Sequence, residues 1–284
     1  MPVTDQQRIP TPTVLSIAGS DPSGGAGIQA DLKTFAVIGV YGGAVISSLT
    51  VQNTLGVRKV IPLAPELVRE QICEVLADLA VSHIKIGMVG STATARAISD
   101  ALREFEGEVI YDPVMRSTSG KSLVEEDGAA VLAEFLVARA TVITPNIPEL
   151  ALLVDRANTG RSETEAAASL FKRFPRLRAV ALTGGHGEKT ADTVSDRLFL
   201  RRPDNANPSC LSLSHPKILT ANSHGTGCTF AAAYTAFHQQ TDDDQAAFAR
   251  TVSFMTQLIQ QSAAYRIGNG NGPLQHHLLR NFQG

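Results

Sequence analysis

The chain has 284 residues, of which 43% are hydrophobic and 18% are charged, and its formal net charge is -2. This length and composition suffice for one sizeable core, and α/β domains of such length often fold as a single unit. The basic residues are scattered, which excludes the basic surface expected of a nucleic-acid-binding protein. No apolar run approaches the ~18 residues that are needed to span a bilayer.

The cysteines and the N-terminus bear on the compartment. Cys73, Cys210 and Cys228 have neither a metal-ligand spacing nor the even number typical of a disulfide framework. The first residues, MPVTDQQRIPTPT, are polar and lack the basic and apolar segments of a signal peptide. We therefore expect a soluble cytoplasmic protein whose partners are small molecules, not nucleic acid or membrane, and whose residues 1–12 form a flexible tail.

Short apolar runs alternate with helical patterns from the start of the chain. Residues 13–19 (TVLSIAG) predict a buried strand, because they are rich in β-branched residues and end at a glycine. Residues 27–39 follow with apolar side chains at helical spacing, and Gly39 is placed to end that helix. A second strand is predicted over 43–52, and a second amphipathic helix over 65–79.

The alternation continues through the middle of the chain. A capping box, Ser162 with Glu165 three residues later, opens one of the later helices. Towards the C-terminus the pattern loosens, and 193–202 and 211–219 are typical of edge strands or a hairpin. The remaining predicted strands are 83–89, 108–114, 141–146 and 179–185. The remaining predicted helices are 92–105, 128–140, 147–154, 162–174, one that begins near Thr226, and 244–266.

Repeated strand–helix units with apolar strands indicate an α/β protein with a mostly parallel sheet and helices on both faces. No repeat, linker or change of composition divides the chain, so we expect one domain over residues 13–284. In such folds ligands bind outside the carboxyl ends of the strands. The segments after the predicted strands are the ones to inspect, namely GSDPSGGAG, QNT, GMVG, DPVM, PNIPE, TGGHG and HGTGC.

The first glycine-rich loop is ambiguous by itself. Gly25, Gly27 and Ala30 fit a relaxed dinucleotide-binding pattern, but no acidic residue stands about 20 positions further on to bind a ribose. A nicotinamide cofactor is therefore disfavoured, and a Walker loop is excluded because no glycine-lysine-serine/threonine ending occurs. A tight turn explains the glycines, but it does not explain Asp21 and Asp31 beside them.

The segment NSHGTGCTFAAA, from Asn222 to Ala233, has stronger chemistry. The first N–H groups of a helix lack intrahelical partners and attract anions, and glycines let a phosphate approach the backbone. A loop-to-helix turn that merely packs remains the alternative. The helix end is expected to lower the pKa of Cys228. Taken alone, that cysteine is more commonly a buried inert residue, and as a nucleophile it would need a histidine such as His186 or His224.

Two acidic residues follow predicted strands. Asp112 and Glu149 offer the hard oxygen ligands that Mg²⁺ prefers. Taken singly, Glu149 is also an ordinary acid in the first turn of a helix, and Asp112 an ordinary residue before a proline turn. Two carboxylates and an anion-binding helix end at one sheet edge together favour phosphoryl transfer, which needs mainly positioning and charge neutralisation.

The ordered set of motifs resembles a known family. AGSDPSGGAGIQADLKTF, QNT, KIGM, DPVM, TPNIPE, GGH, HGTGC and GNGNGP occur here in the order found in hydroxymethylpyrimidine/phosphomethylpyrimidine kinases, from about Val14 to about Pro273. The resemblance implies a ribokinase-like three-layer αβα sandwich, with ATP and Mg²⁺ as cofactors. It also implies phosphorylation of 4-amino-5-hydroxymethyl-2-methylpyrimidine and then of its monophosphate, in thiamine biosynthesis.

The resemblance also implies roles for individual residues. Those expected to line the aminopyrimidine pocket are Gly19, Asp31, Gln52 and Met88. Those expected near the nucleotide are Asn146, Thr183, Gly184 and Gly185, with Asp112 and Glu149 on the metal. In the catalytic segment, backbone N–H groups from Gly225, Thr226 and Gly227 would stabilise the transferring phosphoryl group. Cys228, as thiolate or through a hydrogen bond, would orient and deprotonate the attacking hydroxyl.

The chain departs from the family pattern at two positions. Thr183 and Thr118 stand where many members carry lysine, and we expect Arg116 or Lys121 to compensate. A pyridoxal-type vitamin kinase is the nearest alternative function, and a catalytically weak vitamin-binding sensor is another. A nicotinamide-dependent oxidoreductase is disfavoured. Family analogy also suggests a homodimer.

Overall fold

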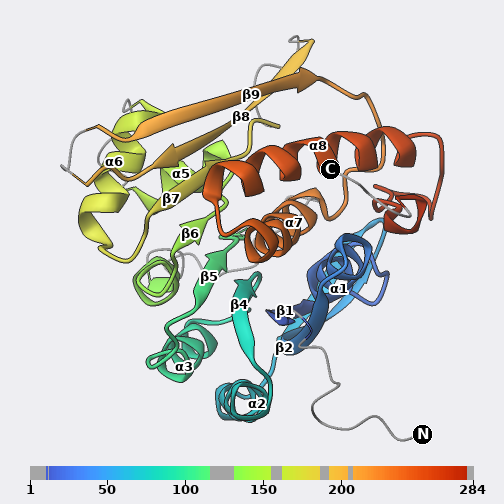
Figure 1. Ribbon diagram of the computed structural model, residues 1–284. Coiled ribbons are helices and arrows are strands. Elements are labelled where there is room, and N and C mark those ends of the chain that lie inside the picture. The colour runs from blue at the N-terminus through green and yellow to red at the C-terminus, as the bar shows by residue number, and fades with distance from the viewer. Residues whose placement is uncertain are drawn as a thin grey trace, which may run out of the picture.

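The computed structural model describes residues 11, 13–115, 131–154, 162–185, 192–203 and 207–279. Within them one nine-stranded sheet has the order β3-β2-β1-β4-β5-β6-β7-β8-β9 (Figure 1). Pairing is parallel from β2 to β7 and antiparallel at both edges. The strands are β1 (Thr13–Ser20), β2 (Tyr41–Asn53), β3 (Gly56–Pro62), β4 (Val81–Ile86), β5 (Glu108–Tyr111), β6 (Val142–Ile143), β7 (Ala179–Leu182), β8 (Thr193–Leu200) and β9 (Ser209–Pro216).

Helices cover both faces of the sheet, which confirms the predicted α/β class (Figure 1). On one face lie α2 (Pro65–Asp78), α3 (Thr92–Ala101), the short π-helical segment η2 (Ala133–Val137), α5 (Ile147–Leu153) and α6 (Glu163–Arg173). On the other face lie α1 (Gly27–Ile38), α7 (Thr226–Thr241) and α8 (Asp244–Ser262). A short 3-10 helix, η4 (His276–Leu278), packs against α1 and α8.

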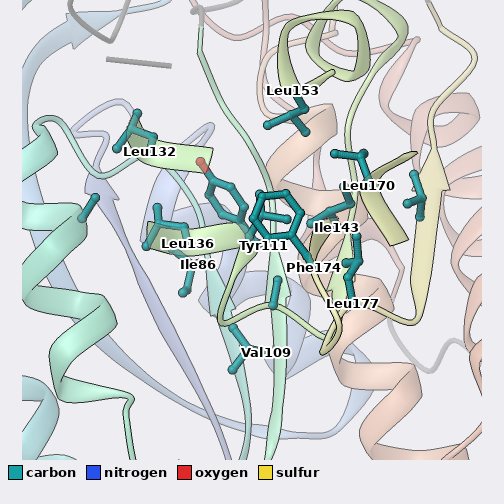
Figure 2. Packing of buried hydrophobic residues seen from close by; sticks show 14 of the residues in the cluster. Ile86, Val109, Tyr111, Leu132, Leu136, Ile143, Leu153, Leu170, Phe174 and Leu177 are labelled. Carbon is teal, nitrogen blue, oxygen red and sulfur yellow. The ribbon is translucent and has the colours of Figure 1, made fainter. Parts of the chain in front are cut away.

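The two faces bury different kinds of side chain. Large residues from the strands and from the first set of helices interlock around Tyr111, Ile143 and Phe174 (Figure 2). On the opposite face α7 is buried along most of its length, and its alanines allow α1 and the sheet to approach closely. Because α7 is packed on all sides, its N-terminal end is held in a fixed position. That end carries the glycine-threonine-glycine segment.

Local signals in the sequence act as expected. Gly39 ends α1 with φ 89°, a left-handed conformation that suits glycine. Ser162 and Glu165 form the predicted capping box at the start of α6. The predicted edge hairpin is the antiparallel pair β8 and β9. Among the described helices, none is both long enough and apolar enough to cross a membrane.

Some boundaries differ from the prediction. β4, β5 and β6 end earlier than expected, at Ile86, Tyr111 and Ile143, so the motifs that follow them are loops. β3 was not predicted, because its side chains alternate only weakly and are mostly exposed. The expected helix over 128–140 is described only from residue 131, and nearly all of the expected tail, 1–12, lies outside the described residues.

Candidate active site

The strand order reverses beside β1, whose neighbours are β2 on one side and β4 on the other. A reversal of this kind leaves a crevice outside the carboxyl ends of the strands, where ligands of α/β proteins bind. The loops after β1, β2, β4 and β5 therefore meet at one edge, and the turn that precedes α7 joins them there.

Asp21 organises the loop after β1. Its Oδ1 accepts hydrogen bonds from the backbone N–H and the hydroxyl of Ser23, at 2.8 and 2.7 Å. Its Oδ2 accepts from the N–H groups of Gly25 and Ala26, at 3.1 and 2.9 Å, and from His224 Nε2 at 2.7 Å. Burial opposes ionisation, but hydrogen bonds from His224 and Ser23 lower the pKa of Asp21 to about 2. Asp21 is thus an ionised acceptor that ties the first glycine loop to the last one.

The glycine-rich turn before α7 packs directly on that loop. Gly225 has φ 83°, and a Cβ there would collide with the carbonyl oxygen of Gly25. No side chain caps the start of α7 or the start of α1. Two uncapped helix N-termini therefore lie side by side, and their partial positive charges favour an anion such as a phosphate. The predicted anion-binding segment, with Thr226 and Gly227, lies at this uncapped helix start, where the Thr226 N–H also donates to the Ser223 carbonyl at 3.4 Å; its binding of an anion stays a prediction.

Cys228 lies in the first turn of α7 and is partly buried. Burial raises the pKa of its thiol to about 12; Lys85 and a hydrogen bond from the Gly27 N–H oppose that rise, and the nearby carboxylates add to it. The expectation that the helix end would lower this pKa is wrong, because desolvation outweighs the helix dipole here. Near neutral pH Cys228 is therefore a neutral thiol, which can orient a hydroxyl group by hydrogen bonding.

Asp31 does not open onto a pocket. Its side chain is fully buried, and its two carboxylate oxygens lie 3.0 Å from Lys85 Nζ, while Ser16 donates to Oδ2 at 2.6 Å. This corrects the expectation that Asp31 contacts an aminopyrimidine: its oxygens are already engaged by Lys85 and Ser16, and no part of the side chain is exposed. Burial raises the pKa of Asp31, although Lys85 and Ser16 act against that rise.

Lys85 is a buried charged residue at the candidate site that the sequence analysis missed. Burial by itself would lower its pKa, but Asp31 and the other negative groups nearby raise the pKa above its ordinary value. Asp112 is one of these groups, and the neutral thiol of Cys228 also lies close, so a buried cation lies beneath the candidate site. A lysine inside the apolar strand HIKI, with an aspartate on the buried side of α1, was the signal that could have revealed it.

The other predicted substrate residues cluster at the ends of β1, β2 and β4. Met88 packs over Gly19, where a Cβ would collide with the Met88 methyl group and lie 2.9 Å from Ser48 Oγ. Ser48 Oγ is buried and has no hydrogen-bond partner among the described residues. Gln52, at the end of β2, lies with its side-chain nitrogen 3.1 Å from His224 Nε2. Gly19, Met88 and Gln52 are thus brought together around the first and last glycine loops.

Asp112 and Glu149 form a second acidic pair. Asp112 Oδ2 is buried without a hydrogen-bond partner in the described part of the chain, and a Cβ on Gly227 would lie 4.0 Å from it. Burial raises the pKa of Asp112 to about 6, and burial together with the charge of Asp112 raises that of Glu149 to about 8. An unsatisfied carboxylate oxygen beside an uncapped helix end would suit a divalent cation. The described residues contain no cluster of three or more metal-binding side chains, so water or phosphate would have to complete the coordination of such a cation.

Glu149 also has a structural role at the start of α5. Its side chain accepts from the Asn146 N–H at 2.9 Å, and Asn146 Oδ1 accepts from the Glu149 N–H, which completes a capping box at the start of α5. Asn146 and Thr183 pair in a parallel bridge, so two of the expected nucleotide segments lie next to each other. The Gly184 N–H donates to Asp196 at 2.8 Å and is therefore engaged, whereas Gly185 is exposed. This corrects the expectation for Gly184, whose N–H is not free for a phosphate.

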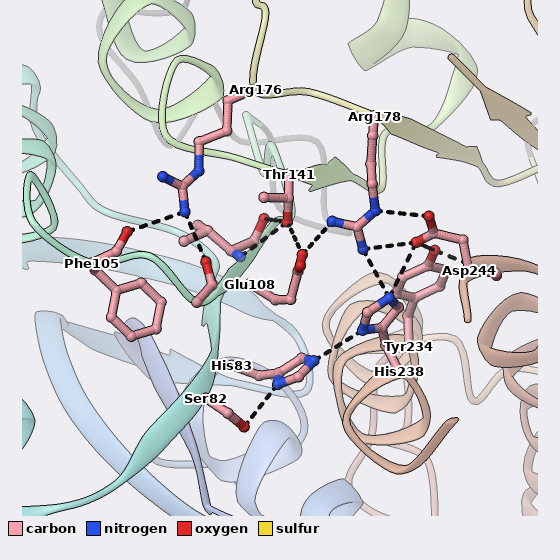
Figure 3. Close-up of polar contacts among 12 residues, drawn as sticks. Ser82, His83, Phe105, Glu108, Thr141, Arg176, Arg178, Tyr234, His238 and Asp244 are labelled. Atoms are coloured by element: carbon pink, nitrogen blue, oxygen red, sulfur yellow. Dashed lines mark hydrogen bonds and ion pairs between the residues drawn. The ribbon is translucent and has the colours of Figure 1, made fainter. Parts of the chain in front are cut away.

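A separate polar cluster lies near the amino ends of the parallel strands, away from the candidate site (Figure 3). His83 Nε2 lies 2.9 Å from His238 Nδ1, and His238 Nε2 lies 2.8 Å from Arg178. Arg178 makes ion pairs with Glu108 and, at 2.8 Å, with Asp244. An open surface cavity of about 370 Å³ lies here, and its lining consists of Glu108, Arg178, Leu200, His238, Asp242, Asp243, Asp244 and Gln245. Because Arg178 is already neutralised, we interpret this cluster as a structural tie between strands and α7.

Four residues named from the sequence cannot be placed. Arg116, Thr118, Lys121 and His186 lie outside the described residues. The proposal that Arg116 or Lys121 replaces the missing lysines therefore stays a prediction.

Comparisons with known proteins agree with the motifs. A family model described as phosphomethylpyrimidine kinase matches residues 21–275. The hydroxymethylpyrimidine/phosphomethylpyrimidine kinase of Rhizobium meliloti (strain 1021) is 40% identical over 268 residues, covering 94% of this chain and 97% of that protein. The phosphomethylpyrimidine kinase structure from Clostridium difficile 630 has a TM-score of 0.71 and 31% identity, covering 88% of this chain and 100% of that one.

A pyridoxal kinase is also similar in structure. The Staphylococcus aureus enzyme in complex with AMP-PCP and pyridoxal has a TM-score of 0.80 at 25% identity, covering 96% of each chain. Its fold is therefore shared with this chain, but the family model and the relative from Rhizobium meliloti carry the other name. With a family match over most of its length and a relative at this identity, the chain belongs to the phosphomethylpyrimidine kinase family.

Proposed function

We propose that this chain transfers the γ-phosphoryl group of ATP to the hydroxyl of 4-amino-5-hydroxymethyl-2-methylpyrimidine, and then a second phosphoryl group to the monophosphate, in thiamine biosynthesis. The observation that carries the proposal is the meeting of an uncapped helix end at Gly227 with the unsatisfied oxygen of Asp112. An anion-binding site beside a metal-binding carboxylate is what phosphoryl transfer requires.

In this proposal the substrate hydroxyl oxygen forms a bond to the γ-phosphorus as the bond to the β–γ bridging oxygen breaks. N–H groups from Gly225, Thr226, Gly227 and Cys228 stabilise the charge on the transferring group. The neutral thiol of Cys228 holds the hydroxyl in line. Because such transition states are loose, the hydroxyl proton leaves late, to a phosphoryl oxygen or to solvent, and no strong base is required.

Asp112 and Glu149 are the residues that we assign to Mg²⁺, which when bound supplies charge neutralisation at phosphate oxygens. Their raised pKa values record two acids that are poorly stabilised in the absence of a cation. Asn146, Thr183 and Gly185 are proposed to lie along the nucleotide. This assignment is supported by their adjacency, through the Asn146–Thr183 bridge, to the acidic pair.

The test is a mass-spectrometric product profile. The purified chain is incubated with the pyrimidine alcohol, ATP and Mg²⁺, and we expect the monophosphate to form first and the diphosphate later. Absence of both products, with ATP unconsumed, would contradict the proposed function and would leave a vitamin-binding sensor as the better description.

A pyridoxal-type kinase is the second candidate, favoured by the structural similarity to the Staphylococcus aureus enzyme. A competition assay that offers pyridoxal and the pyrimidine alcohol together separates the two. We expect kcat/KM to favour the pyrimidine. A preference for pyridoxal would reverse the assignment.

Two further proposals concern the whole protein. We assign a homodimer contact to apolar side chains exposed on the β2–β3 hairpin, which forms one edge of the sheet, and sedimentation velocity tests it. These side chains are Leu49, Val51, Leu55 and Ile61.

A cytoplasmic location is supported by the three cysteines, all of which are free thiols.

A further inference from the structure

The contact between Gln52 and His224 is chemically unusual. The side-chain nitrogen of Gln52 lies 3.1 Å from His224 Nε2, and the same Nε2 lies 2.7 Å from Asp21 Oδ2. A glutamine NH₂ group only donates hydrogen bonds, and an imidazole nitrogen carries at most one hydrogen. Asp21, His224 and Gln52 together therefore determine which atom donates and which atom accepts in each of these hydrogen bonds.

Asp21 decides where the hydrogen of His224 lies. Four donors from Ser23, Gly25 and Ala26 point at its carboxylate, in addition to His224. A carboxylate surrounded in this way is ionised and can only accept. His224 Nε2 must therefore carry a hydrogen and donate it to Asp21, whatever the charge of the ring.

This fixes the orientation of the Gln52 amide. If its NH₂ group faced His224 Nε2–H, two donors would meet at 3.1 Å. A half-turn of the amide exchanges nitrogen and oxygen without changing the shape of the side chain, and the hydrogen-bond partners determine which orientation is populated. With Oε1 towards His224, the amide shares the Nε2–H with Asp21, and the NH₂ group points away from His224.

The outward side of Gln52 is available for a ligand. The residue is half-buried at the carboxyl end of β2, and its other amide atom has no hydrogen-bond partner in the part of the chain that the structure describes. His224 itself is held in place, since its backbone N–H donates to the Gly272 carbonyl at 3.1 Å and its ring packs where a Gly25 side chain would lie. A rigid histidine thus sets the direction of a side chain at the candidate site.

We infer that His224 is a positioning residue that holds Gln52 with its NH₂ group towards the substrate, so that the site selects a ligand with an unprotonated ring nitrogen at this position. The inference rests on the proposed function for the identity of the ring. It assigns Gln52 to an acceptor atom of a nitrogen heterocycle, and not to the exocyclic amine. The amine then requires an acceptor elsewhere.

Two variants of Gln52 distinguish the orientations. The carboxylate introduced by Gln52→Glu still accepts from His224 but has no outward donor, whereas Gln52→Met loses both functions at similar size. We expect Q52E to raise the KM for the pyrimidine alcohol about tenfold or more, at least as much as Q52M, because an acceptor then faces an acceptor. If Q52E keeps the wild-type KM while Q52M does not, the amide oxygen faces the substrate and the inference is wrong.

The role of His224 is tested by rescue. His224→Gln places an amide N–H near the position of Nε2, while His224→Asn places it near that of Nδ1. We expect H224N to raise the KM for the alcohol about tenfold with a smaller change in kcat, and H224Q to remain within about threefold of wild type. Equal losses in both variants would mean that His224 acts only through packing.

A measurement without substrate separates this inference from the proposed function. In ¹⁵N-histidine-labelled protein, long-range ¹H–¹⁵N spectra report which ring nitrogen of His224 carries the hydrogen. We predict a protonated Nε2 in the wild type, and a bare Nε2 would overturn the inference. If wild-type enzyme forms no pyrimidine phosphate but Nε2 is protonated, then the proposed function fails and the orientation of Gln52 stands.

Discussion

At the scale of single residues, charge beneath the candidate site is balanced by Lys85. Its ammonium group is fully buried and pairs with Asp31, while Cys228 and Asp112 lie near enough to affect its pKa. A buried ion pair contributes little by its presence, but removal of one partner leaves the other charge unsatisfied. The loss of stability on removal of the carboxylate therefore distinguishes a structural aspartate from one that binds substrate.

The first prediction concerns Asp31. Asp31→Asn should reduce the free energy of unfolding by about 3–5 kcal/mol, because Lys85 would remain buried without a counter-charge. Urea denaturation followed by circular dichroism measures the change. Wild-type stability with a raised KM for the pyrimidine would instead restore Asp31 as a direct substrate ligand.

The second prediction concerns Cys228. With its pKa raised to about 12, the thiol should react slowly with iodoacetamide near neutral pH, while the exposed Cys73 is alkylated readily. Peptide mass mapping over time compares the two within one sample. We also expect Cys228→Ser to retain more activity than Cys228→Ala, which should lose about tenfold or more in kcat. Faster alkylation of Cys228 than of Cys73 would show a thiolate.

The third prediction concerns the acidic pair. Because the folded-state pKa values of Asp112 and Glu149 lie above their ordinary values, the folded protein binds protons more tightly than the unfolded chain. Their contribution to stability is therefore present at low pH and is lost as pH rises from about 4 to about 8. Mg²⁺ should raise the melting temperature more at about pH 8 than at about pH 5.5, and Glu149→Gln should weaken that difference. An equal magnesium effect at both pH values would argue against binding at this pair.

At the scale of elements, the strand–helix alternation was predictable because buried strands and amphipathic helices leave strong periodic patterns. Gly39 fixed one helix boundary through its left-handed backbone, and Ser162 fixed another through its side-chain cap. β3 was missed, since an exposed edge strand needs no apolar alternation. The loop positions of Asp112 and Asn146 followed from where the strands end, which depends on pairing with neighbours and not on local sequence.

The individual contacts were less predictable than the motifs. The ordered motifs placed Asp112, Gly227 and Cys228 at one edge, and the structure agrees. A lysine inside an apolar strand indicated a buried charge, but its pairing with Asp31 depends on which faces of α1 and β4 meet, and the sequence does not state this. The pKa of Cys228 likewise depended on how deeply the helix end is buried, which a motif does not state.

The fourth prediction concerns the start of α7. Gly225→Ala should destabilise the turn by about 1–3 kcal/mol and should displace it from the first glycine loop, because alanine disfavours φ 83° and its methyl group would collide with Gly25. We expect kcat to fall more than thermal stability alone explains. Gly39→Ala is the matched control, since Gly39 also has a left-handed φ, 89°, but lies at the C-terminal end of α1 with nothing within 4 Å of a Cβ. Similar kinetics for the two variants would mean that the turn has no part in catalysis.

At the scale of the whole molecule, the ribokinase-like α/β fold holds α7 at both ends. Its N-terminal end meets the glycine loops, and near its C-terminal end His238 contacts His83 and Arg178 (Figure 3). The N-terminal end of α7 lies at the carboxyl ends of the parallel strands, and its C-terminal end lies near their amino ends. Loss of the histidine contacts would therefore loosen the helix that carries the anion-binding turn.

The fifth prediction concerns acid stability. Burial, and then the charge of His238, lower the pKa of His83 to about 4, so the unfolded chain binds the proton more tightly between about pH 6.5 and about pH 4. Stability should fall as pH drops through this range, by on the order of 2 kcal/mol for this group. His83→Gln should show a shallower decline in denaturation experiments between pH 7 and pH 5. A wild-type slope in that variant would exclude His83 as the cause.

The central claim is that one site, between the first turn of α7 and the acidic pair, performs phosphoryl transfer. A crystal structure with a non-hydrolysable ATP analogue, Mg²⁺ and the pyrimidine alcohol tests it most directly. The account predicts the γ-phosphate within hydrogen-bond distance of the Gly227 and Cys228 N–H groups, with the metal on the Asp112 side and the alcohol next to Gln52. A nucleotide bound at another edge of the sheet, with the α7 turn unoccupied, would contradict it.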